Sequence, residues 1–106
     1  MKRTKSMIYK ETPESRELYF YAINEGPLYR RMTTPLIANL KKKAGQGIYD
    51  KEKAVDAFYH IACEAAKRYG AEYGGSFSVQ NRFSAAVDME AYYKANEIFC
   101  GKEHRK

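Results

Sequence analysis

The stretch KEKAVDAFYHIACEAAKRYGAEY, residues 51–73, decides the fold class predicted for this chain. Its apolar residues recur at intervals of three and four over about five turns, which places them on one face of an α-helix. That face comprises Ala54, Val55, Phe58, Ile61, Ala62, Ala65, Ala66, Tyr69 and Tyr73. Asp50 precedes the pattern as a helix N-cap, and Gly74-Gly75 follow it as a stop signal. We therefore expect one long central helix over 51–73, whose alanines allow neighbouring helices to approach closely.

Start and stop signals on either side predict three further helices, over 12–24, 35–43 and 79–99. Each is preceded or opened by a hydroxyl residue that can cap its first turn, and the first two carry proline near the first helical position. Glu25-Gly26-Pro27 ends the first of these helices, and residues 28–33 form a short helical turn before the second. The side chains expected to face inward are Leu18, Tyr19, Ala22, Ile23, Leu36, Ile37, Leu40, Val79, Phe83, Ala86, Val87, Ala91 and Ile98. The tyrosines expected to stay partly exposed are Tyr21, Tyr29, Tyr59, and Tyr92 or Tyr93.

No part of the sequence shows a convincing strand pattern, so the predicted fold is all-α. We expect a compact single-domain bundle of four to five helices around the long central helix 51–73. A length of 106 residues suits one modest core. The predicted helical domain covers 12–100, between a flexible basic N-terminal arm over 1–11 and a charged C-terminal tail over 101–106.

The sequence also lacks the segments that direct a chain to a membrane. No apolar run approaches the roughly 18 residues that cross a bilayer, and no hydrophobic region follows the basic start MKRTKSMIYK. We therefore expect a cytoplasmic protein with no membrane partner, and in a reducing compartment Cys63 and Cys100 are most simply thiols.

Residues that could carry chemistry are few and poorly placed for it. His60 and Cys63 share a helix surface, with Glu64 or Asp56 as a third ligand, but no second His/Cys pair completes a zinc site. Neither cysteine lies in a nucleophile signature, and the Gly-Gln-Gly loop after residue 44 has the wrong order for a phosphate-binding loop. We therefore expect no enzymatic activity, catalytic residue, metal, cofactor or small-molecule substrate.

The basic segment is the strongest functional signal. The net charge of +6 is uneven, because residues 26–53 hold seven Lys and Arg against two Asp and Glu. Basic groups bind phosphates, aromatic faces stack on bases, and an asparagine outside the apolar face can contact adenine. The other explanation is local, since lysines in the last turn of a helix complement its macrodipole. The predicted binding residues are Tyr29, Arg30, Arg31, Asn39, Lys41, Lys42, Lys43, Tyr49, Lys51 and Lys53.

The chain is similar to short, functionally uncharacterised helical proteins encoded in phage and prophage genomes. The similarity covers roughly residues 14–90. It implies a mobile-element setting and the cytoplasm of a bacterial host, and it brings no catalytic residues. The residues that carry it are Leu28-Tyr29-Arg30, Thr34-Pro35-Leu36-Ile37, Asn39-Leu40, Lys42-Lys43, Gly47-Ile48-Tyr49-Asp50, Lys53-Ala54, Phe58 and Ala65-Ala66-Lys67-Arg68-Tyr69.

Two hypotheses follow. In the first, a small non-enzymatic phage or prophage accessory protein binds nucleic acid or a nucleoprotein through residues 28–53 and the termini. In the second, a protein-interaction module inhibits a host defence system, such as a CRISPR effector, by occupying an acidic protein surface. Either hypothesis leaves homo-oligomerisation open.

Overall fold

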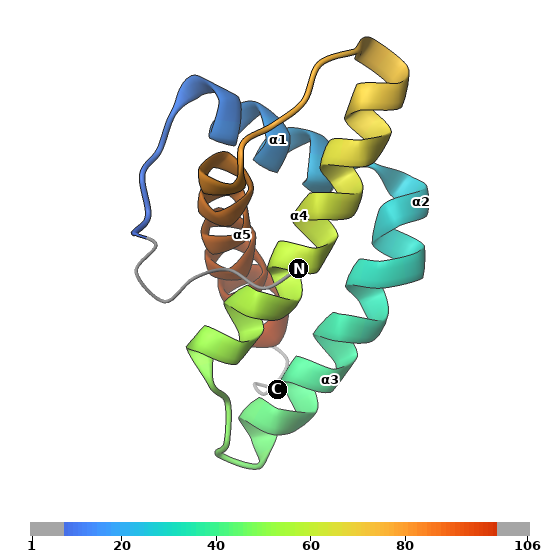
Figure 1. Ribbon diagram of the computed structural model, residues 1–106. Helices are drawn as coiled ribbons and strands as arrows, with labels where there is room; N and C mark the ends of the chain where they lie inside the picture. The colour runs from blue at the N-terminus through green and yellow to red at the C-terminus, as the bar shows by residue number, and fades with distance from the viewer. Residues whose placement is uncertain (1–7, 100–106) are drawn as a thin grey trace.

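The structure is a computed structural model that describes residues 8–99, and the fold over this range is all-α. No strand occurs among these residues, and the helices form one compact bundle, as the sequence predicts. In Figure 1, α4 runs through the middle of the bundle, α5 and α3 lie on either side of it, and α1 crosses one end. The elements are α1 (Pro13–Asn24), α2 (Gly26–Leu28), η1 (Tyr29–Thr33), α3 (Thr34–Gly45), α4 (Lys51–Tyr73), α5 (Val79–Tyr93) and η2 (Lys94–Ile98).

The central helix α4 begins and ends at the predicted residues. The Asp50 carboxylate accepts a hydrogen bond from the Lys53 backbone N–H at 3.2 Å, as an N-cap does. Gly74 ends the helix with a φ of 86°, a backbone conformation that favours glycine. The predicted apolar face is buried from Ala54 to Ala66. Because this face contacts both α1 and α5, α4 organises the core.

The prediction for the tyrosines of α4 is partly wrong. Tyr69 is half-buried, but Tyr73 is 65% exposed, because the last turn of α4 extends beyond the helices that cover the rest of it (Figure 1). Tyr59, expected at the surface, is only 1% exposed. Its position shows that neighbouring helices cover a wider arc of α4 than the single predicted stripe.

The buried face of α5 is also rotated relative to the prediction. Phe83, Ala86 and Ile98 of the α5–η2 segment are buried as expected, but Ala91 is exposed. Tyr93 takes the inward position instead, and its ring stacks on that of Phe58 with centroids 5.6 Å apart and planes 8° from parallel. The hydroxyl-bearing tyrosine therefore fills a core position where the sequence pattern predicts an alanine.

The second predicted helix is longer than expected, because the helix start at Thr34-Pro35 is absent. Helical structure continues without a break from Gly26 to Gly45, and Thr33 has helical dihedral angles and no side-chain cap. Pro35 has no N–H to donate to the carbonyl four residues earlier. The preceding turn widens into the π-helix η1, in which the Thr34 N–H bonds the Tyr29 carbonyl. The chain bends instead at Glu25, which has extended dihedral angles.

The described part of the predicted N-terminal arm lies along α5. The backbone N–H of Lys10 donates to the Ser84 hydroxyl at 3.0 Å, and the Tyr9 hydroxyl donates to Asp88 at 3.0 Å. Ile8–Glu11 therefore belong to the packed structure. The rest of the predicted arm and the tail over 101–106 lie outside the described residues.

We expect enlargement of a core alanine of α4 to destabilise the fold. Ala65 is fully buried, so Ala65→Leu should lower the free energy of unfolding by about 1–3 kcal/mol through overpacking. Ala71 lies exposed on the same helix, and Ala71→Leu should change it by less than about 0.5 kcal/mol. Urea unfolding followed by circular dichroism measures both. Equal losses in the two variants would contradict the packing described for α4.

Candidate basic interface

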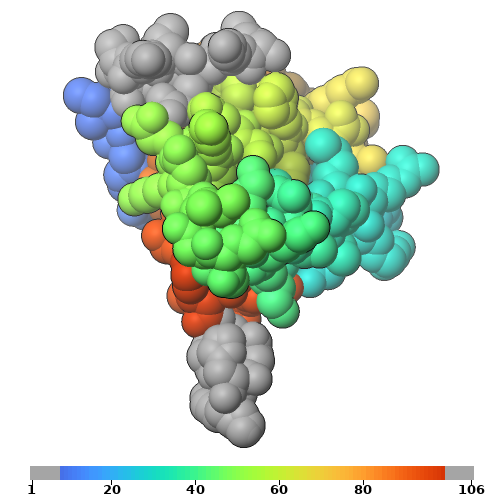
Figure 2. Space-filling view, turned by 90° about the horizontal axis from the view of Figure 1, so that it is seen from below, coloured from blue at the N-terminus to red at the C-terminus, as the bar shows by residue number. Residues whose placement is uncertain are grey.

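Five lysines gather where α3 ends and α4 begins. Lys41, Lys42 and Lys43 lie in the last turns of α3, and Lys51 and Lys53 lie in the first turn of α4. The loop over 46–50 reverses the chain between the two helices, so these lysines share one end of the molecule. Figure 2 looks onto this end, where the green loop and the adjoining helix ends form one continuous surface. We call these five residues the lysine cluster.

The loop holds the end of α3 through backbone hydrogen bonds. The Gln46 N–H donates to the Lys42 and Lys43 carbonyls, both at 3.1 Å, and the Ile48 N–H donates to the Lys43 carbonyl at 3.0 Å. The last carbonyls of α3 therefore have backbone partners. The lysine side chains are not needed to bond these carbonyls and remain available to solvent.

The lysine cluster carries uncompensated positive charge. Four of its members are exposed and Lys43 is half-buried, and none forms an ion pair with another described residue. The acids nearest in sequence are Asp50, whose carboxylate caps α4, and the exposed Glu52 and Asp56. The cluster therefore presents a positive surface to solvent.

The two arginines lie farther along the same helical segment. Arg30 and Arg31 are exposed on η1, roughly 16 Å along the axis from the α3 lysines by the helical rise per residue. The Arg30 guanidinium turns back toward Gly26, where a Cβ would meet its Nη1 at 3.2 Å. Asn39 is exposed on α3, between the arginines and the lysines. The structure thus places Lys51 and Lys53 at the same end of the bundle as the α3 lysines and leaves the arginines farther along the helical segment.

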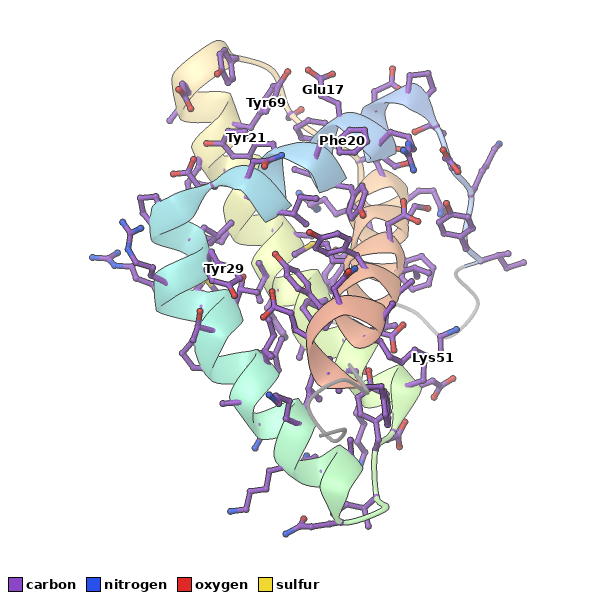
Figure 3. The ribbon with its side chains drawn as sticks, turned by 180° about the vertical axis from the view of Figure 1, so that it is seen from behind. Glu17, Phe20, Tyr21, Tyr29, Lys51 and Tyr69 are labelled. Carbon is purple, nitrogen blue, oxygen red and sulfur yellow. The ribbon has the colours of Figure 1, made fainter. Side chains whose placement is uncertain are left out.

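Tyr29 connects η1 to the far end of the α5 segment. Its hydroxyl donates to the two Glu97 oxygens at 3.0 and 3.2 Å, and its ring lies 6.2 Å from that of Tyr93. Burial raises the pKa of Tyr29, and the Glu97 carboxylate raises it further. Figure 3 shows Tyr29 in the body of the bundle, well away from Lys51 at the start of α4. Its hydroxyl and ring take part in internal packing.

Tyr49 connects the basic loop to α5. Its hydroxyl donates to Glu90 Oε2 at 2.7 Å, and its ring meets that of Phe99 edge-on at 5.1 Å. Lys94 Nζ lies 5.9 Å from the centre of the Tyr49 ring. Burial raises the pKa of Tyr49 above its ordinary value, and the hydrogen bond to Glu90 adds to this shift. The two tyrosines expected to stack on bases are thus both engaged inside the fold.

The sequence reasoning did not identify Glu90, which holds this loop in place. Glu90 is 0% exposed, and the Lys94 ammonium lies 3.3 Å from the same carboxylate oxygen that accepts from Tyr49. A signal was available, because Glu90 lies on the buried face of the helix, four residues after Ala86 and four before Lys94. An acid in a core position with a base one turn later indicates a buried ion pair.

The described residues offer no alternative site built on a metal or a membrane helix. Over residues 8–99, no group of three or more His, Cys, Asp or Glu side chains is placed to hold a metal ion. His60 is exposed and Cys63 is half-buried. No helix in the same range is long and apolar enough to cross a bilayer.

The chain matches no family model, no curated protein and no solved structure. Its function must therefore be inferred from the charge and geometry described above.

We expect loss of the Tyr49 hydroxyl to destabilise the fold. Tyr49→Phe removes a donor from the buried Glu90 carboxylate and should lower the free energy of unfolding by about 1–3 kcal/mol. Tyr73→Phe is the matched control, because Tyr73 is exposed and its hydroxyl has no hydrogen bond among the described residues. Urea unfolding compares the two variants. A loss in Tyr49→Phe no larger than in Tyr73→Phe would show that the bond to Glu90 contributes nothing measurable.

We also expect stability to decline in alkaline solution. Tyr49 and Tyr21 have pKa values raised in the folded state, that of Tyr21 to about 12. Folding therefore favours the neutral forms of these tyrosines. Their contribution to the free energy of unfolding is fully present below about pH 10, the pKa of an unperturbed tyrosine. It is lost as the pH rises from there through the folded-state values. Unfolding free energies measured from pH 9 to about pH 12 should fall, and less steeply in Tyr49→Phe than in the unaltered chain. Identical slopes in the two proteins would contradict this assignment.

Proposed function

We propose that this protein binds nucleic acid, or a nucleoprotein, through the lysine cluster with Arg31 and Arg30 extending the surface. In this proposal it is a small non-enzymatic accessory protein of a phage or prophage that acts in the cytoplasm of a bacterial host. The observation that supports it most is the presence at one end of the molecule of five lysines, from two helices, that form no ion pair with another described residue.

The positions of the lysines on their helices favour this reading over a purely structural one. Lys41, Lys42 and Lys43 lie at the C-terminal end of α3, where a cation complements the macrodipole. Lys51 and Lys53 lie in the first turn of α4, where the positive end of the macrodipole disfavours cations. Helix stability therefore accounts for three of the lysines and leaves two unexplained. An anionic partner accounts for all five.

The surface suits contact with the phosphate backbone better than sequence-specific recognition of bases. Lysine ammonium groups bind phosphates whatever the sequence, and this term dominates non-specific binding. With Tyr29 and Tyr49 engaged inside the fold, the predicted set keeps no aromatic side chain free to stack on a base. We therefore favour sequence-independent binding.

One observation favours the alternative, a protein-interaction module that inhibits a host defence system such as a CRISPR effector. Ile48, at the tip of the loop between the lysines, is 59% exposed. An apolar side chain surrounded by cations resembles the arrangement of protein interfaces, in which an apolar centre is enclosed by a polar rim. Such a surface would fit an acidic protein with a small apolar depression.

A change of the three α3 lysines tests the proposed function. Lys41, Lys42 and Lys43 replaced together by alanine should weaken binding of DNA or RNA several-fold and leave the helical circular dichroism signal intact. On duplex DNA, the dependence of log K on log salt concentration should become shallower by about 0.9 for each phosphate that the variant no longer neutralises. Gel shifts over a series of salt concentrations measure both effects.

The matched single-residue comparison is Lys42→Ala with Lys67→Ala. Both lysines are exposed on helices, but Lys67 lies in the C-terminal half of α4, away from the cluster. Lys42→Ala should weaken binding and Lys67→Ala should not. Unchanged binding in the triple variant would refute the nucleic-acid proposal. A host protein that remains bound to the full chain after nuclease treatment, and no longer binds Ile48→Asp, would support the alternative.

A further inference from the structure

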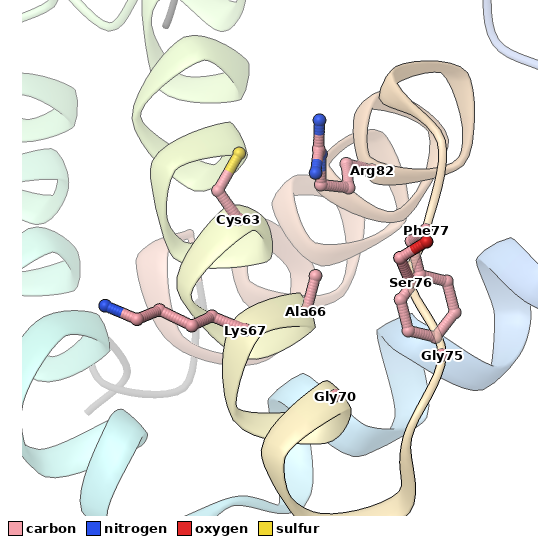
Figure 4. A pocket seen from close by; sticks show the side chains of 8 residues that line it. All are labelled: Cys63, Ala66, Lys67, Gly70, Gly75, Ser76, Phe77 and Arg82. Atoms are coloured by element: carbon pink, nitrogen blue, oxygen red, sulfur yellow. The ribbon is translucent and has the colours of Figure 1, made fainter.

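A cavity of about 260 Å³ lies at the other end of the molecule from the lysine cluster. It is a pocket open to solvent, bordered by the C-terminal half of α4, the loop over 74–78 and the first turn of α5 (Figure 4). Its walls include Cys63, Ala66, Gly70, Gly75, Phe77 and Arg82.

Glycines allow the loop to close one side of this cavity. A Cβ on Gly70 would lie 3.0 Å from the Gly75 carbonyl oxygen, so the loop can approach α4 this closely only because Gly70 has no side chain. Gly74 and Gly75 both have a φ of 86°, which lets the chain turn sharply back toward α5. The close approach of the loop to α4 therefore depends on the absence of a side chain at Gly70.

The polar chemistry of the cavity is basic. Arg82 Nε is buried and has no hydrogen-bond partner among the described residues, and Arg82 forms no ion pair with any of them. No acidic side chain lines the cavity, and Ser76 adds a hydroxyl to its wall. Lys67 contributes its aliphatic stem, since Figure 4 shows its ammonium group extending away from Arg82.

The buried neighbour of Arg82 is Tyr59. Its hydroxyl lies near enough to Arg82 and Cys63 to interact with both side chains, but neither contact has the distance and angle of a full hydrogen bond. Burial raises the pKa of Tyr59, and the Cys63 thiol raises it further, whereas the Arg82 guanidinium lowers it. Buried polar groups are nearly always satisfied, so the unpartnered Arg82 Nε beside the pocket indicates that an acceptor belongs there.

We propose that this cavity binds a small oxyanion, a carboxylate or phosphate group carried by a small molecule, with Arg82 as its charge partner. A guanidinium binds both groups through its fork of N–H donors. The Phe77 ring on the pocket wall can contact a small apolar part of the same molecule. The site is separate from the lysine cluster, so it can be occupied whether or not nucleic acid is bound.

Titration of the full chain tests this site with inorganic phosphate and with acetate, at constant ionic strength. The backbone amide resonances of Gly75, Ser76 and Phe77 should shift with saturation, with a dissociation constant on the order of 1 mM for at least one anion. A tenfold excess over that value should raise the melting temperature by about 5 °C. Arg82→Gln should abolish both effects, and Lys10→Gln, which removes one positive charge at an exposed position outside both surfaces, should leave them intact.

A second measurement does not depend on the Arg82 variant folding. In a Cys100→Ser background, a saturating anion should slow the reaction of Cys63 with a thiol reagent several-fold, because Cys63 lines the cavity. The proposal is overturned if neither anion shifts the loop resonances, if Arg82→Gln binds as well as the unaltered chain, or if Cys63 reacts equally fast with and without anion. The loop resonances and Cys63 lie at the far end from the lysine cluster. Failure of the oxyanion proposal therefore leaves the nucleic-acid proposal standing, and failure of the nucleic-acid proposal leaves the oxyanion proposal standing.

Discussion

Burial of one side of α4 is the constraint on which the other elements depend. Phe58, Ile61, Ala62 and Ala65 are almost completely inaccessible, and small residues along this face let α5 and α1 lie close to α4. Each partner helix therefore has to present a complementary face. The inward turn of Tyr93, whose ring stacks on that of Phe58, follows from this requirement. Because the core is closely packed, contact with α4 fixes how each neighbouring helix is rotated about its own axis. This contact can bury side chains other than those that the amphipathic pattern of the helix predicts.

Hydrogen bonds from tyrosines to carboxylates join the segments that α4 does not hold directly. Tyr29 bonds Glu97 and Tyr49 bonds Glu90, each joining positions far apart in the sequence, and a bond from Tyr21 to Glu72 adds to the contact between α1 and α4. A tyrosine buries its ring and still reaches a polar partner, so it can cross the boundary between core and surface. These bonds explain the use of ten tyrosines in 106 residues better than base stacking does. They also keep the lysine-bearing loop in a fixed position on the bundle.

The two ends of the molecule carry different chemistry. The end with the lysine cluster is open, positively charged and without acidic partners among the described residues, which suits an extended anionic partner. The opposite end holds the pocket beside Arg82, whose lining includes no acidic side chain. Figure 3 shows Glu17, Tyr21 and Tyr69 at that same end, far from Lys51. A phosphate backbone and a small oxyanion could therefore be bound without competition for the same residues.

The sequence by itself determined the fold class, both ends of α4 and the position of the excess positive charge, because caps, glycine stops and helical periodicity act over a few neighbouring residues. It also predicted the set of lysines that the structure places at one end of the bundle. The exposure of Tyr59 and Tyr73, the unbroken helix through Thr34-Pro35 and the buried Glu90 could not be read from such local patterns. Only the tertiary structure decided them, since burial depends on which helix covers which face. For the same reason the cavity beside Arg82 exists only where residues from α4, the loop and α5 meet.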